Sequence, residues 1–213
     1  LRNLEGDLIM SIILDNFDYI NNIEKTGDFT KDVCELLEVN NKNHTKKHVL
    51  EVAETSLKLA DRFLLDSEIC YKSALLHDIS SIIKPKDMIV IANENNMLLD
   101  ISEQKYPFLL HQRISKLIAF HYFGITEKDI LSSIECHTTL RSKPSKYEMV
   151  LFLADKISWD QDGEPPYIDI IEEGLSISLE NACKNYINYV YENNMLLCPH
   201  KWMNEAHRYF ANI

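Results

Sequence analysis

Apolar residues recur every three or four positions along most of this chain, and that spacing predicts α-helices. The clearest case is residues 45–64, where the apolar stripe consists of Val49, Val52, Ala53, Ala60, Phe63 and Leu64. Good strand alternation is lacking, and the 213 residues include only 5 Gly and 6 Pro, which argues against a loop-rich β-fold. We therefore expect a single all-α domain.

Capping residues and prolines predict where the helices begin and end. Thr30 is expected to cap a short helix, and Ser67 to cap the helix that follows the long one. Thr126 and Asp129 resemble a capping box. Together with these signals, the periodicity places further helices near residues 7–21, 85–95, 107–123, 126–137, 145–159, 178–193 and 199–210.

Charge and cysteine usage exclude several classes of protein. A net charge of −11 argues against binding of nucleic acid polymers, which need a basic surface. No stretch reaches the roughly 18 apolar residues of a membrane span, and residues 1–10 do not resemble a signal peptide. The cysteines form no CxxC pair, and we expect reduced core thiols in a cytoplasmic protein. They are Cys34, Cys70, Cys136, Cys183 and Cys198.

Six ionisable residues are expected on the inward faces of five successive helices. His111 shares its face with Ile114 and Ile118, and the dyad His77–Asp78 ends an apolar run. A lone histidine or aspartate on such a face has a milder explanation, as a hydrogen-bonded core residue. Burying six of them without compensation would cost many kcal/mol, which a divalent metal offsets. The six are His48, His77, Asp78, His111, His137 and Asp155.

This ligand set has the chemistry of a catalytic metal site. Imidazole nitrogens and carboxylate oxygens suit Fe, Mn, Zn, Co or Ni, and the lack of Cys ligands argues against a closed structural zinc site. Six ligands exceed what one catalytic metal needs, and they suit two metals. Asp78 is best placed to bridge them.

Five segments, in order, resemble the HD-domain metal-dependent phosphohydrolases, and within them the YqeK-type group. The segments are KHVLEVAETSLKLA (47–60), ALLHDI (74–79), FLLHQRISKLIA (108–119), ECHTTLR (135–141) and VLFLADKI (150–157). The resemblance implies an all-helical HD-domain bundle with a binuclear iron centre. It also implies symmetrical hydrolysis of diadenosine tetraphosphate to two ADP, with His77 and Asp78 essential. Residues 44–160 would form the HD domain, residues 1–43 a helical extension packed on it, and residues 161–213 the helices that complete it.

By this resemblance, each metal has its own ligands. His48, His77, Asp78 and Asp155 would hold one metal. Asp78, His111 and His137 would hold the other.

Around these ligands the chain departs from the family pattern. Ser80 and Ser81 follow the dyad where a Lys is usual, so that Lys84 is the first base, and Leu140 replaces the Gly of HTTGR. After the LAD element, residues 158–163 lack the family's Pro and Arg. These changes leave open a phosphatase or nucleotidase for another nucleotide, linked to NAD metabolism. A non-catalytic helical module that binds a ligand or partner is the alternative of another class.

Several residues near the ligands are candidate phosphate contacts. The guanidinium of Arg141 fits phosphate in a bidentate manner, and Lys143 could assist it or belong to a solvated loop. Thr138 and Thr139 could donate to phosphate or end their helix, and Lys156 could orient Asp155 or bind phosphate. Residues 1–43 and 167–213 carry no motif; they could pack on the core, cover the pocket or form a homodimer contact.

Overall fold

The computed structural model describes residues 24–161 and 163–213, and within these residues the secondary structure is helical, without a β-strand. This confirms the all-α prediction. The predicted helix at 7–21 lies outside the described residues. The elements are α2 (Phe29–Val39), α3 (Asn43–Phe63), α4 (Ser67–Leu76), η1 (Ile79–Ile82), α5 (Pro85–Glu94), α6 (Ile101–Lys105), η2 (Pro107–Leu110), α7 (His111–His121), α8 (Lys128–Cys136), α9 (Lys146–Ile157), α10 (Ile168–Leu175), α11 (Leu179–Glu192) and α12 (Lys201–Phe210).

Three helix starts differ from the predicted ones. The N-cap of α2 is Asp28, not Thr30, and the N-cap of α4 is Asp66, not Ser67. Both aspartates accept hydrogen bonds from backbone N–H groups of the first turn, which is what a capping carboxylate does best. The expected capping box before α8 does not form, because its N-cap is Glu127, which makes no capping bond through its side chain.

The helix predicted at 107–123 is divided in two. Pro107 starts the 3-10 turn η2, and α7 then runs from His111 to His121. Gly124, with φ of +72°, follows the end of α7 as predicted. The division puts His111 at the junction, where the backbone changes from a tight turn to an α-helix.

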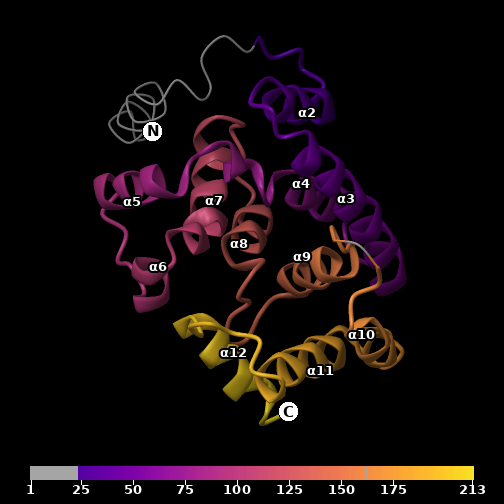
Figure 1. The fold of residues 1–213 in the computed structure, drawn as a ribbon. Helices are drawn as coiled ribbons and strands as arrows, with labels where there is room; N and C mark the ends of the chain where they lie inside the picture. Colours follow the sequence, from indigo (N-terminus) through magenta and orange to yellow (C-terminus); the bar gives the residue numbers. More distant parts are fainter. Residues whose placement is uncertain (1–23, 162) are drawn as a thin grey trace.

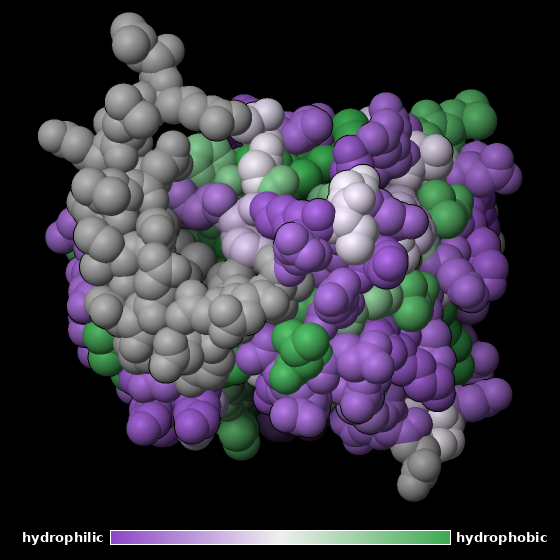
Figure 2. Space-filling view, turned by 90° about the horizontal axis from the view of Figure 1, so that it is seen from above, coloured by the Kyte–Doolittle hydropathy of each residue, from purple (hydrophilic) through white to green (hydrophobic). Residues whose placement is uncertain are grey.

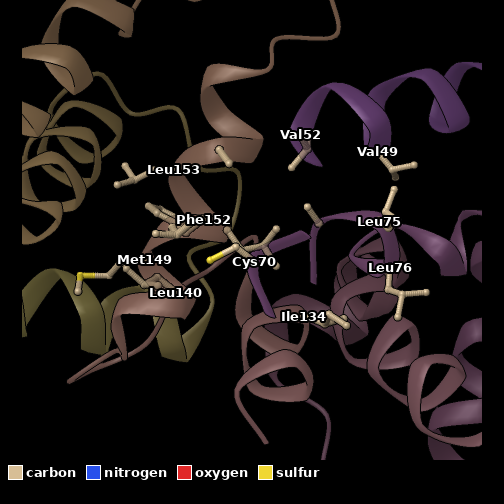
Figure 3. Close-up of a cluster of buried hydrophobic side chains, with 14 of the residues drawn as sticks. Val49, Val52, Cys70, Leu75, Leu76, Ile134, Leu140, Met149, Phe152 and Leu153 are labelled. Atoms are coloured by element: carbon tan, nitrogen blue, oxygen red, sulfur yellow. The ribbon is translucent and has the colours of Figure 1, made fainter. Parts of the chain in front are cut away.

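The core lies where α3, α4, α8 and α9 meet, with α7 packed on α8 (Figure 1). Figure 3 shows side chains from all four helices converging there. They include Val49 and Val52 of α3, Leu75 and Leu76 of α4, Ile134 of α8 and Phe152 of α9. Burial of each such side chain stabilises the fold by roughly 1.5–3 kcal/mol.

The segments before and after this core are also helical. α2 packs on α3 and α4, α11 on α9, and α12 on α11. α10 lies against α11 so closely that a Cβ on Gly174 would stand 2.5 Å from the Cα of Ala182. A larger residue at 174 would therefore push α10 away from α11.

The surface is largely hydrophilic on the face in Figure 2. There, hydrophilic residues make up most of the coloured area, and hydrophobic ones appear in small separate patches. In the described part of the chain, no helix combines the length and hydropathy that a membrane span requires. The cysteines are unpaired; three are buried, whereas Cys34 and Cys198 are half-buried and so are not the core thiols expected.

Candidate metal centre

The fold brings the six predicted ligands together, mostly by way of helix ends. His77 follows the last residue of α4, Asp78 precedes η1, and His137 follows the last residue of α8. His111 is the first residue of α7, at its junction with η2. His48 and Asp155 lie within the long helices α3 and α9, which cross at the core. Neighbouring imidazole rings have centroids 4.8–5.3 Å apart.

Three of the histidines are held in the same way. The Nδ1 atoms of His77, His111 and His137 each lie 2.7–2.9 Å from the backbone carbonyl three residues earlier. A carbonyl only accepts, so each Nδ1 carries the proton and donates it. The neutral ring then has its lone pair on Nε2, which is the arrangement of a histidine metal ligand.

The carboxylate of Asp78 faces both halves of the cluster. Its Oδ1 lies 3.4 Å from Nε2 of His137 and 3.6 Å from Nε2 of His111, while its Oδ2 lies 3.8 Å from Nε2 of His77. Each oxygen is therefore directed at a different set of imidazoles. A carboxylate that bridges two metals must direct one oxygen at each set of ligands, as Asp78 does here.

Asp155 completes the other half. Its Oδ1 accepts a hydrogen bond of 3.1 Å from Nε2 of His48 and lies 3.6 Å from Nε2 of His77. Its Oδ2 accepts from the ammonium of Lys156 at 2.5 Å. One oxygen thus faces the cluster, and the other is held by a lysine.

The charges of the cluster compensate one another. Burial lowers the pKa of His77, but Asp78 and Asp155 outweigh it and raise the pKa to about 9. Burial lowers the pKa of His137 to about 4, and the nearby His77 and His111 add to this effect against Asp78. Although burial works against ionisation, the pKa values of Asp78 and Asp155 are lowered by their cationic neighbours, chiefly His77 for the first and Lys156 for the second. Both carboxylates are consequently anions at neutral pH.

The residues fit a bound metal. His77 is fully buried, yet among the residues that the structure describes its Nε2 has no hydrogen-bond partner, a costly state for a polar atom unless something else binds it. Two ligand triads, His48–His77–Asp155 and His77–Asp78–His137, each have ligand atoms within 4.8 Å of one another. Ligands at about 2.1 Å from a shared cation stand about 3–3.6 Å apart, close to the distances between Nε2 of His77 and the two carboxylates.

The predicted phosphate contacts near these ligands are already engaged. The hydroxyl of Thr138 lies 2.9 Å from Nε2 of His111, within the cluster. Thr139 is buried and its hydroxyl is hydrogen-bonded to Gln112. Of these two threonines, Thr138 is the one whose hydroxyl contacts a predicted metal ligand.

Arg141 and Lys143 lie elsewhere. Arg141 donates to Glu148 at 2.6 Å and to the carbonyl of Ser132 at 2.9 Å. Both basic residues line a cavity of about 560 Å³ whose wall includes neither Asp78 nor His111. We call it the Arg141 cavity; for phosphate to bind Arg141 there, its ion pair with Glu148 would have to open.

A second cavity borders the cluster itself and was missed by the sequence reasoning. It measures about 640 Å³, and Asp78 and His111 form part of its wall. We call it the metal-side cavity. Its basic residues are Lys42, from the loop before α3, and Lys84, which precedes α5. The one sequence signal for this cavity was Lys84, the first basic residue after the His77–Asp78 dyad. The loop at 40–43 carries no pattern that indicates a binding site.

Comparisons with known proteins show what this chain is similar to. Residues 45–160 match the HD domain family. An uncharacterized protein in the pepC 5' region of Lactococcus lactis subsp. cremoris is 34% identical over 155 residues, which cover 73% of this chain and 78% of that one. A Bacillus subtilis (strain 168) protein named symmetrical bis(5'-nucleosyl)-tetraphosphatase is 25% identical over 158 residues, covering 73% and 84%. The crystal structure of a predicted HD superfamily hydrolase involved in NAD metabolism, from Clostridium acetobutylicum, superimposes with a TM-score of 0.74 at 26% identity, covering 85% of this chain and 96% of that one.

Proposed function

The chain belongs to the HD domain family and is a hydrolase, and we propose that it cleaves diadenosine tetraphosphate symmetrically to two ADP with a binuclear metal centre. One observation carries the proposal: Nε2 atoms of four histidines converge on the carboxylates of Asp78 and Asp155. The name of the Bacillus subtilis relative supports this choice of substrate.

The two carboxylates divide the proposed ligands between two cations. His48, His77, Asp78 and Asp155 would hold one, and Asp78, His111 and His137 the other, because the oxygens of Asp78 face both groups. We propose iron because the family resemblance implies it; the same nitrogen and oxygen ligands also accept manganese, zinc, cobalt or nickel. When bound, such cations lower the pKa of water and neutralise charge on phosphate oxygens.

The chain's own residues prepare this site for an anionic substrate. The backbone carbonyls that hold the three Nδ1 protons fix the imidazoles in one orientation. Lys156 holds Oδ2 of Asp155, which supports an orienting role for it. Thr138, with its hydroxyl beside His111, is the residue we propose to donate a hydrogen bond to a phosphate oxygen.

A related nucleotide is the second candidate substrate. After the dyad, the Ser80 hydroxyl donates to the carbonyl of His111 and accepts from the Ser115 hydroxyl at 3.0 Å, so it serves packing. The phosphate-contacting residues therefore differ from those of the YqeK-type pattern. The similarity to a hydrolase involved in NAD metabolism favours testing mononucleotides as well.

The experiment is a substrate panel. Protein reconstituted with iron or manganese is assayed on diadenosine tetraphosphate and on mononucleotides, with products separated by chromatography. We expect ADP as the sole product of diadenosine tetraphosphate and a higher kcat/KM for it than for any mononucleotide. A preference for a mononucleotide would show that diadenosine tetraphosphate is not the main substrate. Absence of both bound metal and activity would favour a non-catalytic module.

We also propose the domain division made from the sequence. α11 packs on α9 and α12 on α11, which supports residues 161–213 as part of the same domain as 44–160. α2 packs on α3 and α4, in keeping with an N-terminal extension held against the core. A cytoplasmic location and a homodimer are further proposals, to be tested by cell fractionation and by light scattering.

A further inference from the structure

The metal-side cavity is the space that a substrate would enter to reach Asp78 and His111, since both residues line it. We propose that it binds a nucleoside polyphosphate, with Lys42 and Lys84 on the phosphates and Phe108 against the base. The inference rests on the proposed function and adds the residues that select nucleotides. The alternative binding site is the Arg141 cavity, whose wall includes neither Asp78 nor His111.

The ammonium groups supply the charge that a polyphosphate needs. Among the residues that the structure describes, Lys42 forms no ion pair, whereas Lys46 four residues later pairs with Glu38 at 2.9 Å. Lys84 is exposed and also lines the metal-side cavity. In a chain of net charge −11, two lysines beside a metal site form a local attraction for an anion.

The backbone adds to this charge. α3 starts after Lys42 and α5 after Lys84, and in the described part of the chain no side chain caps the N–H groups of either start. The N-terminal ends of two helices, each carrying partial positive charge, therefore lie at the wall of this one cavity. They reinforce the two lysines that precede them.

The remaining wall suits a flat apolar group. Phe108 is 50% exposed although it is a large hydrophobic residue, and Val39, Ile82 and Met88 line the same space. The backbone carbonyl of Phe108 accepts from Nδ1 of His111, so the backbone of Phe108 is held one turn before a proposed metal ligand. Stacking of a base on an aromatic ring is worth about 1–3 kcal/mol, which a small phosphate ester cannot gain.

The arrangement has a consequence for selectivity. Phosphates near the metals would extend toward Lys42 and Lys84, and the base would lie against Phe108. A volume of about 640 Å³ falls within the usual range for small-molecule sites. Nucleotides with several phosphates should bind much better than nucleoside monophosphates.

The test uses Lys42→Gln and Phe108→Ala in full-length, manganese-loaded protein. Kinetics are measured on diadenosine tetraphosphate, and binding of ADP by calorimetry. We expect KM to rise about tenfold in each variant, with a matching loss of ADP affinity, and kcat and metal content within about twofold of wild type. Lys86→Gln and Phe120→Ala are matched controls, exposed residues of the same types outside this cavity, and should behave as wild type.

The outcomes separate this inference from the proposed function. If the wild type cleaves diadenosine tetraphosphate while both variants keep its KM and ADP affinity, the cavity assignment is wrong and the function stands. If fully metal-loaded wild type neither binds ADP nor cleaves diadenosine tetraphosphate, both fail. Circular dichroism and thermal melts of each variant exclude misfolding as the cause of a changed KM.

Discussion

The Nε2 atoms of His111 and His137 lie 3.0 Å apart, from helices α7 and α8, while both Nδ1 atoms donate to backbone carbonyls. In the neutral rings, two lone pairs would therefore face each other. Such an arrangement is unfavourable unless a proton or a metal cation lies close to both. With Oδ1 of Asp78 within 3.6 Å of each Nε2 atom, a divalent cation would satisfy all three groups at once.

Asp78→Asn should remove activity without unfolding the protein. The substitution takes away the negative charge that faces both halves of the cluster, so we expect kcat/KM to fall at least about 10³-fold, or roughly 4 kcal/mol. Far-ultraviolet circular dichroism should stay unchanged. Asp61→Asn, an exposed aspartate of α3, is the control. A fully active Asp78→Asn protein would remove the basis of the proposed mechanism.

Lys156→Met tests the orienting role of this lysine. Without the ammonium on Oδ2, Asp155 can rotate away from His48 and His77, and we expect metal affinity to fall about 10- to 100-fold. Metal titration with a competing chelator measures it. Unchanged metal affinity with a raised KM would instead assign Lys156 to phosphate binding.

Leu140→Gly should destabilise the protein, although Gly is the residue of the related HTTGR motif. Leu140 has φ of +52°, a conformation that costs a residue with a Cβ about 1–2 kcal/mol and that Gly adopts freely. Its side chain, however, is fully buried in the core (Figure 3), and truncation of a buried Leu costs about 2–5 kcal/mol. We expect a net loss of about 1–3 kcal/mol in the free energy of unfolding, measured with urea; a gain would contradict this balance.

The stability at acid pH should depend on Glu103. This carboxylate is fully buried and pairs with Arg113 at 2.9 Å and with His200 at 3.6 Å. Burial would raise its pKa, but His200, the backbone of Asp100 and Arg113 lower it below 4.5. A lowered pKa stabilises the folded state above pH 4.5, and the stabilisation disappears as pH falls through the folded pKa.

Glu103→Gln should therefore cost about 3 kcal/mol at neutral pH, because Arg113 is left without its partner. The same variant should lose less stability than wild type between pH 4.5 and pH 3. Urea unfolding at a series of pH values measures both effects. Parallel curves for the two proteins would rule out this role of Glu103.

Much of the fold could be predicted from the sequence, because its helices are long and periodic. The elements that escaped prediction are short or depend on tertiary contacts. α6 has only five residues, and its capping box of Asp100 and Glu103 was not recognised. His200 is the N-cap of α12 and is buried against Glu103, a contact of 3.6 Å between residues about a hundred positions apart that no local pattern reveals.

For the site, periodicity and the order of the motifs identified six candidate ligands, and the structure brings their side chains together, although His77, Asp78 and His137 lie just beyond helix ends and not within helices. It was not enough for the residues around them. Arg141 follows His137 by four positions, yet its guanidinium is held by Glu148 and Ser132 at another cavity. Lys42 belongs to a loop, where no period indicates direction, and only the tertiary structure, which brings this loop to the same cavity as η1 and the start of α5, reveals its role.

The most direct test of the central claim is the metal content of the purified protein. After anaerobic reconstitution with iron, the six converging ligands predict about two metal ions per chain, and activity that rises with occupancy. Fewer than one bound ion per chain, with no hydrolysis after reconstitution, would contradict a binuclear phosphohydrolase.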